Sequence, residues 1–432
     1  MKRLLLALAT LYALLIAPLA EAGVRIEHWI SPSGARVYFV ESRGLPILDV
    51  QVDFAAGSMF DPEGKSGTAG LTRTLLDLGA GNLDENAIAD RLADVGAILS
   101  GGADTDRASV ALRTLVSPDK RDPALDILRT VLASPRYDAT VFEREKARAV
   151  AGLKDALTRP DAISGRAFWQ ALYPKHPYGR QSTPESVAAL TREELLAFYR
   201  SHYVARNATV TLVGSIARGD AERIAESLVA GLPAGAPAAL PPAPGLPKGE
   251  TRALAHPATQ SHITIGLPAV ERGNPDFFPL LVGNYTLGGG GFVSRLMKEV
   301  RDKRGYAYSV YSYFAPLRQS GPFQIGLQTK RSQAKEALSV ALDVLKAFLA
   351  EGPTADELAA AKANLTGSFP LRLDSNKKIL ENVANIGFYG LPLDYLDRYQ
   401  EKIQAVTADD VRRAFAKTVR PDHLVTVTVA AD

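Results

Sequence analysis

Apolar and polar residues alternate along the chain between positions 48 and 54. The apolar side chains Leu48, Val50, Val52 and Phe54 are separated by Asp49, Gln51 and Asp53. Because successive side chains of a strand point to opposite faces, this alternation predicts a strand with one buried and one polar face. The β-branched runs at 208–213 and 424–429 predict two further strands.

Other segments carry apolar residues at helical spacing. Leucines recur at i, i+4 and i+7 from position 71, and Pro160 ends a long amphipathic run. Thr191 and Glu194 form a capping box, which marks the start of another helix. The helices predicted in this part of the chain cover 71–78, 124–132, 142–157 and 191–199. Strands and helical pairs without regular βαβ alternation predict an α+β fold, in which helices pack on one face of a mainly antiparallel sheet.

The order of these elements occurs twice in the sequence. Residues 124–129 resemble 341–346, which is an offset of 217 positions. Three further pairs of segments match at nearly the same offset, namely 138–142 with 354–358, 191–195 with 407–411, and 208–213 with 424–429. One such match can arise by chance between amphipathic helices, but four at one offset indicate a tandem duplication of one domain.

Six prolines between positions 233 and 247, among alanines and glycines, separate the two copies. This composition is typical of a semi-rigid exposed linker. We therefore predict two homologous α+β domains at 23–232 and 250–432, joined by a linker at 233–249. The length of about 410 residues after position 22 is enough for two domains of roughly 200 residues each.

The N-terminus has the three parts of a secretory signal peptide. Two basic residues are followed by an apolar run at 4–16 and by the small-x-small triplet at 20–22. A membrane anchor needs roughly 20 apolar residues, whereas this run is shorter and is followed by Pro18. We expect cleavage at the end of the triplet, a periplasmic location and no membrane anchor in the mature chain.

Composition narrows the classes of function. The chain has no cysteine, which excludes a lipid anchor attached through cysteine and a disulfide framework. Its 50 basic and 47 acidic residues give a formal charge of +3, and loss of residues 1–22 removes two basic and one acidic residue, leaving +2. A nearly neutral protein lacks the basic surface of a nucleic-acid binder, so no nucleic acid is expected as a partner.

Motifs in both copies are similar to those of one protein family. The first copy contains Lys-His-Pro-Tyr-Gly at 175–179, and the second contains four glycines at 288–291, Ser-Arg-Leu at 294–296 and a charged segment with Ala-Tyr-Ser-Val at 299–310. Together they resemble the pitrilysin or insulinase family of zinc peptidases and the related mitochondrial processing peptidase. The resemblance covers nearly all of the mature chain, and it implies that two homologous two-domain chains close into one cavity.

The metal-binding motif of that family is absent at the corresponding positions. In the family, His-x-x-Glu-His binds zinc through two histidines and supplies a glutamate that polarises water, and a later glutamate is the third ligand. With Gly67 placed on the family's leading glycine, the histidine positions hold Gly70 and Thr74, and the catalytic glutamate position holds Arg73. The third-ligand position holds Ala151. We therefore expect no metal and no cofactor in this chain.

The histidines do not replace the lost ligands. They stand at positions 28, 176, 202, 256, 262 and 423. No two are spaced i, i+3 or i, i+4, the spacing that places two ligands on one helix face. We interpret each as a surface or packing residue, and we do not expect a zinc hydrolase that is active by itself.

The second copy keeps two residues that the resemblance links to catalysis. In the family, an arginine and a tyrosine seven residues later hydrogen-bond the substrate backbone and the oxyanion, and Arg301 and Tyr308 have that spacing. A fixed phenol and guanidinium stabilise the negative oxygen that forms when zinc-bound water attacks a peptide carbonyl. The alternative is that Arg301 lies on an exposed helix face and Tyr308 packs on a strand beside Tyr306 and Val310. The glycines at 288–291 predict a flexible turn into a helix at 292–300.

Two functions are consistent with these residues. In the first, the chain is the non-catalytic subunit of a heterodimeric periplasmic zinc peptidase. A homologous partner then supplies His-x-x-Glu-His and zinc, and this chain supplies Arg301 and Tyr308 for the hydrolysis of peptides. In the second, it is a structural or peptide-binding protein, like the core subunits of respiratory complexes, with no role in hydrolysis. Loss of the zinc motif fits both, whereas retention of Arg301 and Tyr308 favours the first.

Overall fold

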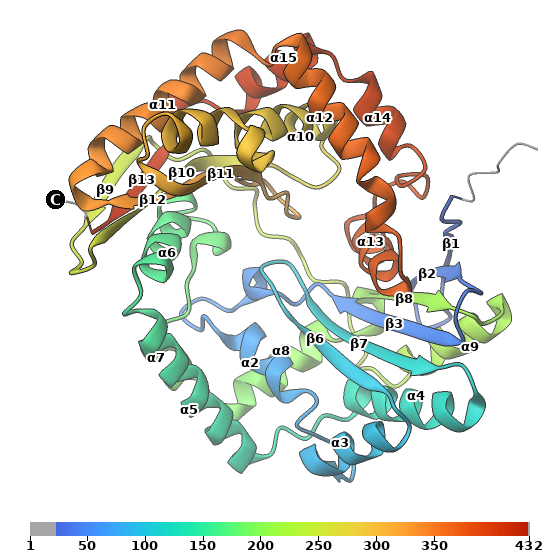
Figure 1. The fold of residues 1–432 in the computed structure, drawn as a ribbon. Helices are drawn as coiled ribbons and strands as arrows, with labels where there is room; N and C mark the ends of the chain where they lie inside the picture. The colour runs from blue at the N-terminus through green and yellow to red at the C-terminus, as the bar shows by residue number, and fades with distance from the viewer. Residues whose placement is uncertain (1–22, 431–432) are drawn as a thin grey trace, which may run out of the picture.

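The computed structural model describes residues 23–430. The predicted signal peptide, residues 1–22, therefore lies outside the described residues. The chain forms two similar halves that face each other, with the first half at the bottom and the second at the top of Figure 1. Within residues 23–430, no helix combines the length and the apolar character that a membrane span requires.

The first half is built on a six-stranded sheet. Its strands are β1 (Glu27–Ile30), β2 (Arg36–Glu41), β3 (Ile47–Phe54), β6 (Ile98–Ala103), β7 (Ala108–Leu115) and β8 (Ala208–Gly214). The spatial order is β1-β2-β8-β3-β7-β6, and every neighbouring pair is antiparallel except β2 with β8. The strands predicted at 48–54 and 208–213 are β3 and β8, so these predictions are confirmed.

Helices cover one face of this sheet. The helices of the first half are α2 (Thr68–Leu75), α3 (Glu85–Asp94), α4 (Pro118–Ala133), α5 (Ala139–Ala156), α6 (Pro160–Leu172), α7 (Pro184–Ala188), α8 (Arg192–His202) and α9 (Arg218–Val229), with a small hairpin of β4 (Gly79–Ala80) and β5 (Leu83–Asp84). Of these, α6 packs on the sheet of the second half instead. The apolar face of β3 is fully buried in a core to which α2, α4 and α8 contribute. The capping box of Thr191 and Glu194 is present at the start of α8.

The second half is built on a five-stranded sheet. Its strands are β9 (Glu250–Leu254), β10 (Gln260–Val270), β11 (Ala307–Phe314), β12 (Gly321–Lys330) and β13 (Val425–Val429). The order is β11-β12-β10-β13-β9, with one parallel pair, β13 with β9. Its helices are α10 (Phe277–Asn284), α11 (Ala334–Glu351), α12 (Ala355–Gly367), α13 (Asn376–Tyr389), α14 (Tyr399–Ala405) and α15 (Ala408–Thr418).

Short helical turns connect these elements. In the first half they are η1 (Ser58–Phe60), η2 (Pro177–Gly179) and η3 (Ala205–Asn207). In the second half they are η4 (Tyr285–Gly289), η5 (Gly291–Val293), η6 (Met297–Asp302), η7 (Arg331–Gln333), η8 (Phe369–Arg372) and η9 (Pro421–His423). Two of them, η4 and η6, are wide π-type turns, which are often found at functional sites.

The two sheets have the same topology. The order β2-β8-β3-β7-β6 in the first half corresponds strand by strand to β9-β13-β10-β12-β11 in the second, and the parallel pair occupies the same place. Helix α5 begins at residue 139 and α12 at residue 355, which is an offset of 216. The prediction of two homologous α+β domains is therefore confirmed.

Each half gives one helix to the other. Helix α6 packs on β10 and β13 of the second sheet, and α13 packs on β8, β3 and β2 of the first (Figure 1). The ring of Phe168 lies against Gly266, and the ring of Tyr38 lies against Gly387. The sequence predicted helices on one face of each sheet. That description holds for the remaining helices of each half, whereas the second face receives a helix from the other half.

Residues 233–249 contain no helix or strand. This connection is nevertheless attached to both halves, because Asn207 Oδ1 accepts a hydrogen bond from Ala238 N and Gln319 Nε2 donates one to the carbonyl oxygen of Pro241. The connection therefore runs as a strap along the surface between the two sheets.

Candidate functional site

The positions that hold zinc in the resembling family lie on α2 and α5, which pack against each other. Gly70, Thr74 and Ala151 are exposed on these helices, and the hydroxyl of Thr74 donates to the carbonyl oxygen of Gly70 at 2.9 Å. None of the three offers a metal ligand of the kind that zinc requires. Across the described part of the chain, no group of three histidine, cysteine, aspartate or glutamate side chains is arranged to hold a metal ion.

Arg73 occupies the place of the catalytic glutamate and is buried, with 4% of its surface exposed. Its Nε donates to the carbonyl oxygen of Ser109 at 2.6 Å, and its Nη2 donates to that of Ser100 at 3.1 Å. Its Nη1 lies 3.3 Å from a carboxylate oxygen of Asp77. The guanidinium thus connects α2 to strands β6 and β7.

The Arg73 guanidinium has room in this position because residue 101 in β6 is a glycine. A Cβ atom at Gly101 would lie 2.6 Å from Arg73 Nη2, and the backbone there has a φ of 136° that side chains rarely adopt. A fixed cation in this position repels a divalent metal, in addition to the loss of ligands. The residues of this chain therefore do not fit zinc.

Arg301 and Tyr308 lie side by side in the second half, on η6 and β11. The guanidinium carbon of Arg301 lies 5.6 Å from the centre of the Tyr308 ring. Tyr308 is 88% exposed, and it follows Ala307 at an irregularity in the pairing of β11 with β12. Tyr308 is therefore not packed in the strand face beside Val310, which is buried.

Phe292 completes this cluster, and the sequence did not single it out. The Arg301 guanidinium carbon lies 4.8 Å from the Phe292 ring, so Arg301 contacts two aromatic rings. Phe292 is 67% exposed and belongs to η5, and regular helical turns begin only after Ser294. The predicted helix at 292–300 is thus wrong at its start, because the Ser294 hydroxyl bonds to the carbonyl of Gly291 and receives the N–H of Met297.

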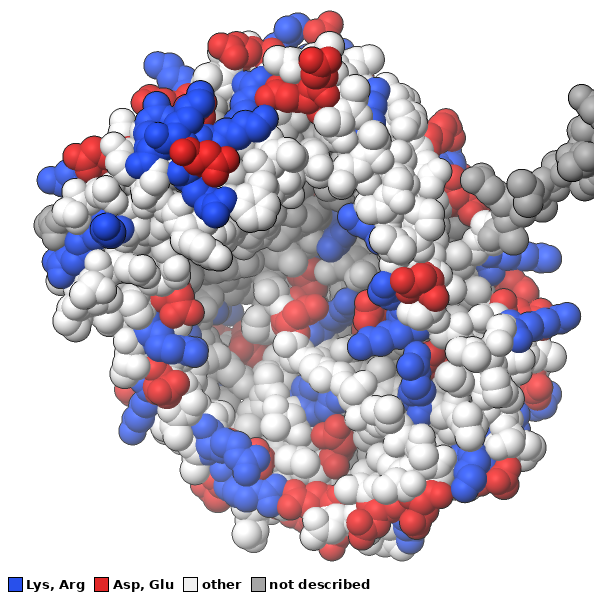
Figure 2. Space-filling view, in the orientation of Figure 1, with Lys and Arg blue, Asp and Glu red and all other residues white. Residues whose placement is uncertain are grey.

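A hollow lies between the two halves, and charged side chains of both signs line the wall that the first half forms (Figure 2). The polar face of β3 lies close to this hollow and is covered by α13 of the second half. Asp49 forms a bidentate pair with Arg113 at 2.7 and 3.0 Å. Gln51 donates to Asp53, and burial raises the pKa of Asp53 to about 6. A cavity of about 250 Å³ lies between this face, β6, β7 and α13.

A buried carboxylate joins the two halves at the edge of the hollow. Asp106, in the turn between β6 and β7, accepts hydrogen bonds from the hydroxyls of Tyr178 and Tyr389 at 2.7 and 2.9 Å. It also accepts one from the backbone N–H of Arg318 at 2.8 Å. Burial raises the pKa of Asp106 above its ordinary value. The motif at 175–179 thus contributes Tyr178 to the contact between the halves.

Sequence profiles match both halves of this architecture. The profile described as Insulinase (Peptidase family M16) matches residues 37–183, and the profile described as Peptidase M16 inactive domain matches residues 189–365. A crystal structure of a peptidase M16 inactive domain from Pseudomonas fluorescens is 36% identical, with a TM-score of 0.92, and it covers 95% of this chain and 99% of that chain. The chain belongs to the peptidase M16 family.

Two relatives of this chain have names that differ in the activity they state. A protein of Helicobacter pylori named non-peptidase homolog YmxG is 25% identical over 90% of this chain and 90% of its own length. An uncharacterized zinc protease of Streptomyces coelicolor is 31% identical over 57% of this chain, and the match spans 55% of that protein. Likeness to these proteins therefore does not decide whether this chain has peptidase activity, and the residues at the site have to be considered.

Proposed function

We propose that this M16 chain is the non-catalytic subunit of a heterodimeric peptidase whose homologous partner carries the zinc motif. One observation carries the proposal. The zinc positions are lost and Arg73 closes that site, whereas Arg301 and Tyr308 stand together on the surface of the other half. A chain that had lost all contact with substrate chemistry has no evident reason to expose such a pair.

The chemistry of the pair supports a role in peptide hydrolysis. Attack on a peptide carbonyl puts negative charge on its oxygen, and a fixed O–H or N–H donor stabilises that charge. The Tyr308 hydroxyl forms no hydrogen bond with any residue of 23–430, so it is free to donate to a ligand. Arg301, held by the rings of Phe292 and Tyr308, can bind the backbone carbonyls of an extended peptide.

The proposal includes a compartment and a cofactor. The segment 1–22 directs the chain to the periplasm, where the partner subunit and its zinc are located. The mature chain alone then binds less than one zinc per molecule and cleaves no peptide, because Gly70, Thr74 and Ala151 supply no ligand.

A structural or peptide-binding role without hydrolysis is the second candidate. The ion pair of Asp49 with Arg113 and the contacts of Asp106 between the halves support it, since they keep the two halves in a fixed arrangement that needs no metal. In that case Arg301 and Tyr308 bind peptide or pack against a partner, and their removal leaves hydrolysis by a partner unaffected.

The two candidates differ in the effect of two substitutions. The mature chain is purified from its native host with its partner, and the complex is assembled with either Tyr308→Phe or Arg301→Ala. We expect kcat/KM for a peptide substrate to fall roughly 10²–10³-fold, equivalent to about 3–4 kcal/mol. The zinc content of the partner and the amount of complex should not change.

Two further variants serve as matched controls. Tyr313→Phe removes a hydroxyl from the same strand, where it donates to Gln324. Arg304→Ala removes a guanidinium that pairs with Glu299. Both complexes should cleave like the wild type. If Tyr308→Phe and Arg301→Ala also assemble and cleave like the wild type, the chain is a scaffold, and the second candidate replaces the first.

A further inference from the structure

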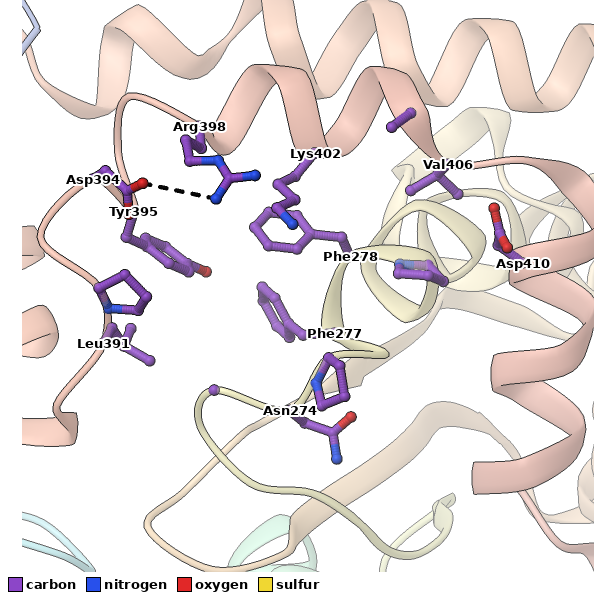
Figure 3. Close-up of a pocket in the computed structure, with 15 residues that line it drawn as sticks. Asn274, Phe277, Phe278, Leu391, Asp394, Tyr395, Arg398, Lys402, Val406 and Asp410 are labelled. Atoms are coloured by element: carbon purple, nitrogen blue, oxygen red, sulfur yellow. Dashed lines mark ion pairs between the residues drawn. The ribbon is translucent and has the colours of Figure 1, made fainter.

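A cavity of about 380 Å³ lies in the second half, between the start of α10, the loop before α14 and α14 itself (Figure 3). Arg301 and Tyr308 are not among the residues that line it. Its walls are largely apolar, and the lining side chains include Phe277, Phe278, Leu391, Tyr395 and Val406. Its volume falls in the range of about 300–1,000 Å³ that is typical of small-molecule pockets.

Aromatic rings form one wall of this cavity. The Phe278 ring lies 5.6 Å from that of Phe277 and 5.8 Å from that of Tyr395, measured between centroids. Tyr399, which is buried, supports Phe278 from behind at 5.6 Å. Phe277, Phe278 and Tyr395 remain half-buried, so an apolar ligand would remove further aromatic surface from water.

Three polar groups point into the cavity above these rings. They are the ammonium of Lys402, the guanidinium of Arg398 and the hydroxyl of Tyr395 (Figure 3). Within residues 23–430, the Lys402 ammonium forms no ion pair and the Tyr395 hydroxyl forms no hydrogen bond. Burial raises the pKa of Tyr395 to about 12, so its hydroxyl stays protonated at neutral pH and can donate.

The acidic groups around the cavity already have partners. Arg398 lies 3.7 Å from Asp394 and 3.6 Å from Glu401. Asp410 accepts hydrogen bonds from the backbone N–H and the hydroxyl of Thr407 at the start of α15. Among the charged groups named here, the Lys402 ammonium is therefore the one without a partner of opposite charge within residues 23–430. Its positive charge makes the cavity complementary to an anion.

We propose that this cavity binds a small carboxylate with an apolar body. The carboxylate pairs with Lys402 and accepts a hydrogen bond from Tyr395, while the apolar body packs on Phe277 and Phe278. A free aromatic or aliphatic acid has this chemistry, and so does the C-terminal carboxylate of a peptide that ends in an apolar residue. The cavity shares no residue with the Arg301 and Tyr308 site, so either proposal can fail without the other.

Binding to the mature chain tests this proposal by calorimetry or NMR titration. The probes are 4-phenylbutyrate, its neutral amide and butyrate, which lacks the aromatic body. We expect 4-phenylbutyrate to bind at least about 10-fold more tightly than its amide, since a charge-assisted hydrogen bond contributes at least that factor. We also expect it to bind at least about 10-fold more tightly than butyrate, because butyrate buries no aromatic ring. The peptide acetyl-Ala-Ala-Phe with a free C-terminus, compared with its C-terminal amide, distinguishes the two sources of the carboxylate.

Lys402→Met keeps the apolar part of the side chain and removes the charge. It should weaken 4-phenylbutyrate about 10-fold and leave the amide unchanged. Lys346→Met, at an exposed lysine of α11, is the matched control and should have no effect. The proposal is overturned if the acid and its amide bind equally, if Lys402→Met binds the acid like the wild type, or if no probe binds.

Discussion

A single arginine shows how a lost catalytic position has been reused. The sequence alone shows only that an arginine, Arg73, stands where the family has its catalytic glutamate. In the structure its guanidinium is buried and bonds to Ser109, Ser100 and Asp77. The sequence could not predict this, because the partners are backbone carbonyls on strands 27 and 36 residues away. Replacement of a metal site by a structural charge follows only once the strands are placed.

Arg73 should therefore be necessary for stability. Arg73→Ala leaves two carbonyl oxygens and the Asp77 carboxylate without their donor, and we expect the free energy of unfolding to fall by about 3 kcal/mol in urea titration. Arg129→Ala is the matched control. Arg129 pairs with Asp126 on the surface of α4, and its loss should change stability by less than about 0.5 kcal/mol. Equal effects of the two substitutions would show that the buried guanidinium has no structural role.

At the scale of elements, local pattern was sufficient to predict strands β3, β8 and β13 and several of the helices. The alternation in β3 and the capping box of α8 act over a few residues, so the sequence determines them directly. The exchange of α6 and α13 was not predictable in this way. An amphipathic helix shows that it packs on an apolar surface, but not which of two homologous sheets supplies that surface.

A glycine of α13 provides a test of the packing of this helix on the first sheet. A Cβ at Gly387 of α13 would lie 2.6 Å from Cδ2 of the buried Tyr38 ring, so Gly387→Ala should lower the melting temperature despite the higher helix propensity of alanine. We expect a loss of about 1–3 kcal/mol.

Gly367 of α12 provides the control for this substitution. A Cβ there meets no atom within 4 Å, so Gly367→Ala keeps only the gain in helix propensity. It should leave the melting temperature unchanged or raise it, by up to about 1 kcal/mol in stability. If both alanines raise it, α13 does not pack on the first sheet as closely as the structure indicates.

At the scale of the whole molecule, buried charges connect the two halves beside the hollow. Asp53 is fully buried, and Arg107 lies 3.7 Å from it. Arg107 also donates to Asn385 of α13, which belongs to the other half. With Asp106, these groups make the contact between the halves sensitive to protonation. The sequence identified Asp53 as the polar face of a strand, but its burial depends on the helix that the second half supplies.

The stability of the molecule should therefore depend on pH through Asp53. Burial, opposed by Arg107, raises its pKa from 3.8 to about 6, so the folded state binds the proton more tightly than the unfolded state. The contribution of Asp53 is present below about pH 4 and is lost as pH rises through 6. Relative to Asp53→Asn, the wild type should lose about 2–3 kcal/mol between pH 4 and pH 8, as measured by urea unfolding at each pH.

The direction in which stability changes with pH distinguishes Asp53 from a carboxylate whose pKa is lowered by folding. Hydrogen bonds from Thr407 and the charge of Arg413 lower the pKa of Asp410, which lies on the surface. Asp410→Asn should therefore give the opposite trend at lower pH, with the wild type gaining stability over the variant as pH rises toward about 4 and little further change above it. If Asp53→Asn follows the direction of Asp410→Asn, then Asp53 is ionised in the folded protein well below pH 6. Asp53 would then form a charged pair with Arg107 inside the first half, and acid would weaken the hold on the guanidinium that donates to Asn385 of α13.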